Sequence, residues 1–202
     1  MKLRNAEKRL LIAVSQIIEN EGFSKIGVNK IANQAKCDKV LIYRYFSGLE
    51  GLLAAWAKDN DFYTLAYQAY SERVTKAESS EDIIKLTQTV LLKQLNFLRT
   101  NKLMQELLAW ELSGNSTFRS IQNERERNGF KLQEELEKKL GKESKDVRMF
   151  ITILIASINY IVLTTRQYRI FNGIDFSNPE AWELCKQTIY KYIRALFENI
   201  LK

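Results

Sequence analysis

The amino-acid sequence predicts an all-α protein, and three observations lead to that fold class. The 202 residues are 46% hydrophobic, which is enough for a real core and too apolar for a disordered chain. They include one proline and only eight glycines, so strand-and-turn architectures lack the residues that their turns require. Apolar residues also recur at steps of three and four, which is the period of an amphipathic helix.

Nine helices are expected from this period and from the caps and breakers between the segments. Ser79 with Asp82 three residues later forms a capping-box pattern, and Asn178 precedes a proline suited to a first helical turn. The expected helices cover residues 4–20, 28–35, 39–45, 49–76, 80–99, 102–112, the stretch from a break at 114–116 to 141, 144–171 and 179–200.

The positive charge is concentrated at the start of the chain. Residues 1–48 carry nine Lys/Arg and four Asp/Glu, whereas the other 154 residues carry 22 and 20. A basic head on a nearly neutral body indicates a polyanionic partner; a solvated basic face without a partner is the alternative. We expect two parts, a basic one at 1–48 and a nearly neutral one at 49–202, joined by a rigid helix.

Composition argues against several other classes of protein. There is no histidine, so the commonest general base and metal ligand is absent, and we expect no enzyme, no metal site and no cofactor. Cys37 and Cys185 lie far apart and form no CxxC pair, and no signal peptide is recognisable, which favours a reduced cytoplasm. The apolar stretch 149–163 is shorter than a membrane span of roughly 20 residues, so we expect it to be buried in a core or a subunit interface.

A helix-turn-helix is predicted at about residues 27–46. Two short helices, 28–35 and 39–45, are separated by three residues, with Asp38 placed to cap the second. Helices so joined cross steeply only where their contact is small and apolar. The inner faces offer that contact through Ile31, Ala32, Ala35, Ile42 and Phe46. In this geometry the second helix enters the major groove of double-stranded DNA.

The residues expected to touch DNA follow from their chemistry and position. Lys39 can reach a phosphate or a guanine edge, and Val40 and Leu41 can contact thymine methyl groups. Tyrosine hydroxyls, basic side chains and helix N-terminal amides bind phosphates, although one of Tyr43 and Tyr45 is expected to pack instead. The full predicted set is Lys2, Arg4, Gly27, Val28, Asn29, Lys30, Asp38, Lys39, Val40, Leu41, Tyr43, Arg44 and Tyr45.

Four short runs give the motif a family likeness: Glu21-Gly22-Phe23, Val28-x-x-Ile31-Ala32-x-x-Ala35, Leu41-Ile42-Tyr43-Arg44-Tyr45-Phe46 and Glu50-x-Leu52. Over about residues 6–53 they resemble the DNA-binding domain of tetracycline-repressor-like (TetR family) transcription regulators. The resemblance implies three N-terminal helices for DNA and six for ligand binding and dimerisation, and so a DNA-binding domain at 1–48 and an effector-binding and dimerisation domain at 49–202. It also implies a repressor released by a small-molecule effector, with the last two helices pairing with a second subunit in a four-helix bundle.

Five positions depart from the family pattern. Lys36 stands where the turn usually has glycine, which predicts a left-handed backbone on a residue with a side chain. Gly27 replaces the usual hydroxyl residue, and Leu49 replaces a lysine, so two phosphate partners are missing. Val40 and Leu41 replace small residues on the reading helix. These differences change the expected DNA contacts more than the fold.

A ligand pocket is implied among the helices that follow the DNA-binding domain. Aromatic residues are frequent there, and packing into an ordinary core is the alternative for each of them. The predicted ligand-binding residues are Trp56, Tyr63, Tyr67, Phe97, Met104, Trp110, Asn159 and Arg166.

A homodimer is predicted from the two apolar helices near the end of the sequence. The expected interface residues are Ile151, Leu154, Ile155, Ile158, Ile161, Ile189, Ile193 and Leu196. A twofold dimer would read a pseudo-palindromic operator. An effector-independent DNA-binding dimer is the main alternative, ahead of a helical enzyme or a partner-binding bundle.

Overall fold

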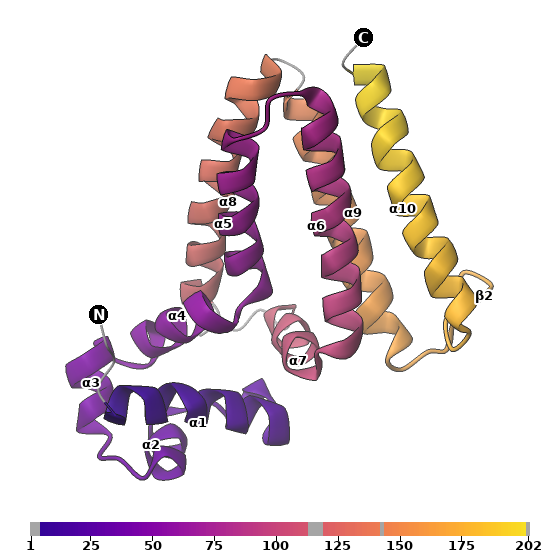
Figure 1. Cartoon of the computed structure of the whole chain (residues 1–202). Helices are drawn as coiled ribbons and strands as arrows, with labels where there is room; N and C mark the ends of the chain where they lie inside the picture. Colours follow the sequence, from indigo (N-terminus) through magenta and orange to yellow (C-terminus); the bar gives the residue numbers. More distant parts are fainter. Residues whose placement is uncertain (1–4, 113–118, 142–143, 201–202) are drawn as a thin grey trace. The chain divides into compact units, whose positions relative to one another are not determined.

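The computed structural model describes residues 5–112, 119–141 and 144–200, and it confirms the all-α fold class (Figure 1). Its elements are α1 (Asn5–Glu21), the 3-10 turn η1 (Phe23–Lys25), α2 (Val28–Ala35), α3 (Val40–Phe46), α4 (Leu49–Asn60), α5 (Phe62–Thr75), α6 (Ser80–Thr100), α7 (Lys102–Glu111), α8 (Arg119–Leu140), α9 (Ser144–Thr165), β1 (Ile170–Phe171), β2 (Ile174–Asp175) and α10 (Pro179–Ile200).

The described residues form two compact units. Unit one contains residues up to 65 together with 102–127, and unit two contains 66–101 together with 128–200. The expected division at residue 48 is a division of function, which these compact units do not test, so it stays a prediction.

Helix α1 organises unit one. Its apolar face, Leu10, Ala13, Val14, Ile17 and Ile18, is buried as the helical period predicts. Contacts from α1 reach α2, α3, α4 and α7. Of these partners, α2 and α3 form the predicted helix-turn-helix, and α4 follows it. Burial of one amphipathic face of α1 therefore holds these helices together.

The single helix expected at 49–76 is wrong, because the chain breaks at Asp61 into α4 and α5. The Asp61 carboxylate accepts hydrogen bonds from the Thr64 amide at 2.9 Å and the Thr64 hydroxyl at 2.8 Å, as an N-terminal cap does. Cap residues favour a new helix start over continuation of the old one. The break accounts for ten α-helices in the described ranges instead of nine.

Asp61 also anchors a buried charge network in unit one. The Arg125 guanidinium contacts the Asp61 carboxylate at 2.6 and 2.9 Å and Glu111 at 2.8 Å, and it lies 4.6 Å from the Tyr63 ring centre. Burial alone lowers the pKa of the guanidinium, but the charges of Asp61 and Glu111 outweigh it and raise that pKa. Loss of one partner would leave a buried charge unpaired and lower the free energy of unfolding by about 3–5 kcal/mol. The network therefore ties the α4–α5 junction to α7 and α8.

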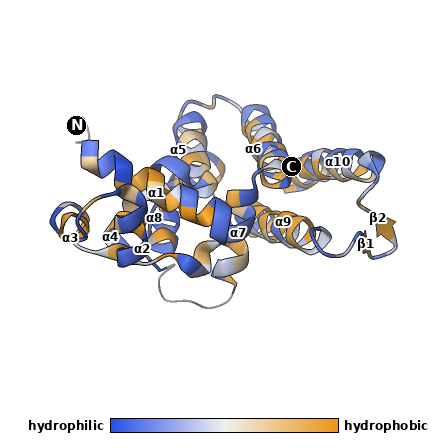
Figure 2. Ribbon diagram, turned by 90° about the horizontal axis from the view of Figure 1, so that it is seen from below, coloured by the Kyte–Doolittle hydropathy of each residue, from blue (hydrophilic) through white to orange (hydrophobic). Residues whose placement is uncertain are grey.

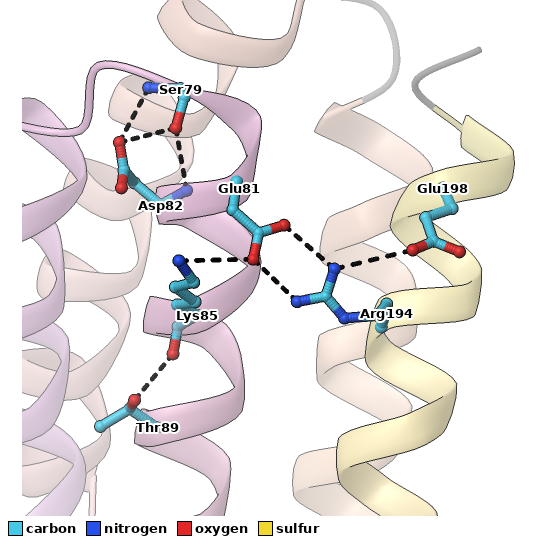
Figure 3. A network of polar contacts seen from close by, with 7 residues as sticks. All are labelled: Ser79, Glu81, Asp82, Lys85, Thr89, Arg194 and Glu198. Atoms are coloured by element: carbon cyan, nitrogen blue, oxygen red, sulfur yellow. Dashed lines mark hydrogen bonds and ion pairs between the residues drawn. The ribbon is translucent and has the colours of Figure 1, made fainter.

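In unit two, α6 packs against both α9 and α10. The predicted capping box is confirmed: the Asp82 amide donates to the Ser79 hydroxyl at 3.2 Å, and the Ser79 amide donates to the Asp82 carboxylate at 3.0 Å. Figure 3 shows the same turn of α6 holding α10, where the Arg194 guanidinium donates to both Glu81 oxygens at 2.8 and 3.0 Å. A bidentate pair of this kind fixes orientation as well as distance.

The helix expected at 144–171 is too long, because α9 ends at Thr165 and a short hairpin follows. Ile170 pairs with Asp175 and Phe171 with Ile174 in antiparallel register. Asn172 (φ 50°) and Gly173 (φ 77°) form the turn. Positive φ at both central residues is what a two-residue hairpin of this twist needs, and Asn-Gly supplies it. The Asn172-Gly173 pair is a local turn signal in the sequence, but a prediction made from the low overall glycine count misses it.

Helix α9 leaves most of its apolar surface uncovered by its own chain. By length and composition it could cross a membrane, with a mean hydropathy of 1.9 over 18 residues of which 17% are buried. Hydrophobic colouring runs along much of α9 in Figure 2. Met149, Ile153, Ala156 and Tyr160 are exposed at helical spacing and form a stripe along one side. This segment is expected to be buried either in a core or in a subunit interface. In the single chain α9 is not a core helix.

Candidate nucleic-acid interface

The predicted helix-turn-helix is present as α2, a short turn and α3. The expected inner face is buried, with Ile31 and Ile42 at 0% exposure and Ala32 and Ala35 nearly as inaccessible. Phe46 is half-buried and meets Tyr45 edge-on. The close contact of small and branched side chains holds the two helices together.

The turn confirms the left-handed backbone predicted for Lys36, which has φ 50° and ψ 47°. The Cys37 amide donates to the Ala32 carbonyl at 3.0 Å, and the Lys36 amide donates to the Asn33 carbonyl at 3.1 Å. These are the two hydrogen bonds of a Schellman motif, a helix end at which glycine is the usual residue. The next helix starts as predicted, since the Val40 amide donates to the Asp38 carboxylate at 2.9 Å.

A second left-handed residue, Ser47 (φ 61°), ends α3. Beyond it α4 passes so close to α3 that a Cβ at Gly51 would lie 1.7 Å from the Phe46 carbonyl oxygen. Only glycine permits this approach. Trp56 then fastens α4 to α1 through a 2.9 Å hydrogen bond from its indole nitrogen to the Ser15 hydroxyl. Gly51 was not singled out from the sequence, because a lone glycine at a helix start carries no distinct signal.

The outer surface of α3 is polar, basic and partly apolar. Val40 is 59% and Tyr43 57% exposed, and Lys39 and Arg44 are exposed beside them. Leu41 and Tyr45 are half-buried, so Tyr45 is the tyrosine that packs. An exposed valine and tyrosine on a helix of seven residues form a surface suited to a partner.

The other predicted DNA contacts fall in three groups. Asn29 and Lys30 are exposed on α2, where Lys30 forms an ion pair with Glu21 at 2.7 Å. Gly27 and Val28, at the start of α2, are half-buried, and Asp38 is exposed. Lys2 and Arg4 lie outside the described residues.

The predicted ligand-binding residues divide between the two units. In unit one, Trp56 and Met104 are fully buried, Tyr63 is nearly so, and Trp110 contacts the Phe23 ring. In unit two, the Asn159 side chain accepts a 2.9 Å hydrogen bond from Gln94, Phe97 is half-buried and Arg166 is exposed.

Of the predicted ligand residues, Tyr67 lines a described cavity. That cleft of about 320 Å³ lies between α5 and α8, with a polar lining of Tyr67, Gln68, Ser71, Glu72, Thr75, Asn128, Lys131, Glu134 and Glu135. A ligand role stays a prediction for all of the predicted residues, Tyr67 included. Within the described ranges, no three histidine, cysteine or carboxylate side chains gather in a way that could hold a metal ion.

The predicted dimer residues differ in exposure. Ile158, Ile189 and Ile193 are buried inside unit two, whereas Ile151, Leu154, Ile155, Ile161 and Leu196 are half-buried. The most exposed apolar side chains on the same helices were not in the predicted set: Met149, Ile153, Tyr160, Leu184, Tyr190 and Tyr192. Periodicity identified the apolar helices but not which side their own chain covers.

Residues 11–56 match the family model described as "Bacterial regulatory proteins, tetR family". The whole chain resembles solved structures, among them NalD of Pseudomonas aeruginosa, the secondary repressor of the MexAB-OprM multidrug efflux pump (TM-score 0.65, 15% identity, 92% of this chain and 94% of NalD). SCO4454 of Streptomyces coelicolor, a TetR-family transcriptional regulator, is similar at TM-score 0.62 and 14% identity, over 98% of this chain and 91% of that one.

FadR of Bacillus subtilis, in complex with stearoyl-CoA, is similar at TM-score 0.58 and 17% identity over 96% of each chain. At such identities these likenesses establish the fold. No curated protein matches the sequence.

The close approach at Gly51 generates a prediction about the direction of α3. Gly51→Ala should destabilise the protein by about 1–3 kcal/mol, because the added methyl must displace the Phe46 carbonyl or part α3 from α4. Denaturant unfolding measures the loss, and DNA binding should weaken in parallel.

Gly129→Ala is the matched control, since Gly129 lies within α8 with open space around its Cβ position. It should gain about 0.5–1 kcal/mol from helix propensity. Equal stability changes in the two variants would show that the α3–α4 contact is not tight.

Proposed function

Because the chain belongs, through its N-terminal domain, to the tetR family of bacterial regulatory proteins, which are non-enzymatic DNA-binding transcription regulators, we propose that it is a cytoplasmic repressor. It binds a pseudo-palindromic operator as a homodimer, and a small molecule releases it. The observation that carries this proposal is the outer face of α3, where Val40 and Tyr43 stand exposed between Lys39 and Arg44.

The α3 surface divides into positions that read bases and positions that hold the backbone. Lys39, Val40 and Leu41 occupy the first turn, which in this motif points toward base edges. Tyr43 and Arg44 follow where hydroxyl and guanidinium groups suit phosphates. Lys30 would have to exchange its ion pair with Glu21 for a phosphate.

Two alanine variants test this division once selection from a random duplex library has supplied an operator. Tyr43→Ala should weaken binding to all selected sequences by a similar factor, roughly five- to tenfold for one phosphate hydrogen bond. Leu41→Ala should change preference at particular base positions, because a methyl contact distinguishes thymine. Retardation assays on matched and singly substituted operators measure both effects.

Asn20→Ala, at an exposed position on α1, is the control and should leave binding unchanged. Equal weakening of all sequences by Leu41→Ala would exclude direct reading by that residue. Wild-type affinity must also fall steeply with salt, by orders of magnitude for several phosphate contacts. A flat salt response would exclude the electrostatic part of the proposal.

The dimer proposal rests on the stripe of Met149, Ile153, Ala156 and Tyr160 on α9, with Leu184 and Tyr192 exposed on α10. Leaving so many large apolar side chains in water is unfavourable by roughly 25 cal/mol for each Å². A twofold axis covers them with the same surface of a second copy. It also pairs two recognition helices about 34–36 Å apart or at a multiple of that spacing.

Ile153→Glu should convert a dimer to a monomer, because it places a charge in the centre of the stripe. Light scattering after size exclusion reads the mass, and operator affinity should fall with it. Phe130→Glu, at a 60% exposed apolar position on α8, is the matched control and should stay dimeric. A wild-type monomer would exclude the proposal, and binding of wild type to lipid vesicles would instead favour a membrane role for α9.

The effector proposal is supported by the polar cleft between α5 and α8 and by the stearoyl-CoA complex of FadR, a protein of the same fold. By linkage, a compound that weakens operator binding must itself bind more weakly to the operator complex. A compound screen by thermal shift, repeated with operator present, checks this reciprocity. If no compound shows it, the effector-independent regulator is the better description.

A further inference from the structure

The turn between α2 and α3 holds a residue in a conformation that its side chain disfavours. Lys36 is left-handed, and left-handed backbone is costly for any residue with a Cβ. A turn of this kind persists only where its surroundings stabilise it. The Schellman bonds end at the carbonyls of Ala32 and Asn33, so the carbonyls of Ala35 and Lys36 are left to side-chain donors or water, and the Cys37 thiol lies 3.4 Å from the Ala35 carbonyl.

The Arg9 side chain, from α1, supplies those donors. Its Nε donates to the Ala35 carbonyl at 2.8 Å, and its Nη2 donates to the carbonyls of Ala35 and Lys36. The planar guanidinium can bond two adjacent carbonyls at once, which a lysine ammonium cannot do in a fixed plane. Its positive charge also lies at the negative C-terminal end of α2.

We propose that Arg9 is a positioning residue for DNA binding: it clamps the left-handed turn at Lys36 and so sets the direction of the recognition helix α3. The proposal rests on DNA binding by α3, as proposed above. Two of its three guanidinium nitrogens, Nε and Nη2, are taken up by the turn, so in this proposal Arg9 acts on the turn and not on DNA. The hydrogen bonds from Arg9 stabilise the left-handed backbone at Lys36. Glycine at this position would adopt that backbone without such bonds.

Loss of the clamp should lower the population of the binding-competent turn. Apparent affinity falls in proportion to that population, whatever the intrinsic contacts are worth. Glycine at position 36 restores the left-handed conformation independently of Arg9. The effect of losing Arg9 should therefore be smaller when position 36 is glycine, and a double-mutant cycle isolates this coupling from any phosphate contact made by Lys36 itself.

The cycle consists of wild type, Arg9→Gln, Lys36→Gly and the double variant, with operator affinity measured over a range of salt. Arg9→Gln should bind about tenfold more weakly, the loss for one charge-assisted hydrogen-bond pair. On the Lys36→Gly background the same change should cost about twofold or less, by the same conversion. Arg9→Lys should resemble Arg9→Gln, because the charge remains and the fork is lost.

Lys8→Gln is the matched control, since it removes the same charge from the neighbouring exposed position of α1 and should change affinity by about twofold or less. The salt dependence decides between positioning and direct contact. A positioning residue leaves the slope unchanged, whereas loss of one phosphate contact per subunit lowers it by about 0.9 for each contact. A lowered slope, or an equal loss on both backgrounds, would overturn the proposal.

Amide hydrogen exchange tests the clamp without DNA and so remains informative if DNA binding itself fails. The Cys37 amide, bonded to the Ala32 carbonyl, should exchange at least about fivefold faster in Arg9→Gln, while the Val14 amide in the core of α1 keeps its protection. Unchanged exchange at Cys37 would contradict the clamp. If exchange at Cys37 is faster in Arg9→Gln but the wild-type protein binds no operator, the clamp is supported and the proposed function is excluded.

Discussion

Helix α3, the proposed recognition helix, has seven residues, and a helix of two turns cannot maintain its own structure or direction in water. The direction of α3 must therefore be set by its contacts with the rest of the protein. Ile42 is enclosed in the core of unit one, the Phe46 backbone lies against Gly51, and left-handed residues close the turns before and after the helix. The direction of α3 is therefore a property of the packing around it.

Much of that packing returns to α1. Its buried face supports α2, α3 and α4, its Ser15 holds Trp56, and its Arg9 holds the end of α2. The same unit also takes in α7 and the first part of α8, through the Arg125 network. The compact unit that contains α3 is thus larger than the first 48 residues.

Unit two differs from unit one, because its helices α9 and α10 bury one side and leave large apolar side chains of another side in solvent. The Arg194–Glu81 ion pair joins α10 to α6, and the Ser79–Asp82 capping box fixes the start of α6. The outer stripe of α9 is made of side chains that a single chain does not cover. In the proposed dimer, the same surface of a second copy would cover this stripe.

Local sequence determined most of the helices, the cap at Asp38 and the capping box at Ser79, because those features depend on residues a few positions apart, and the left-handed turn at Lys36 is predicted from the family resemblance. The break at Asp61 combines a local cap with a tertiary ion pair, whereas tertiary structure alone decided the need for glycine at position 51 and the contacts of Arg9. Their partners are Arg125, the Phe46 backbone and the carbonyls at the end of α2, and only the packed chain brings those groups together. It also decided which side of α9 stays exposed, since a helix that is apolar around its circumference shows no preferred face in its sequence.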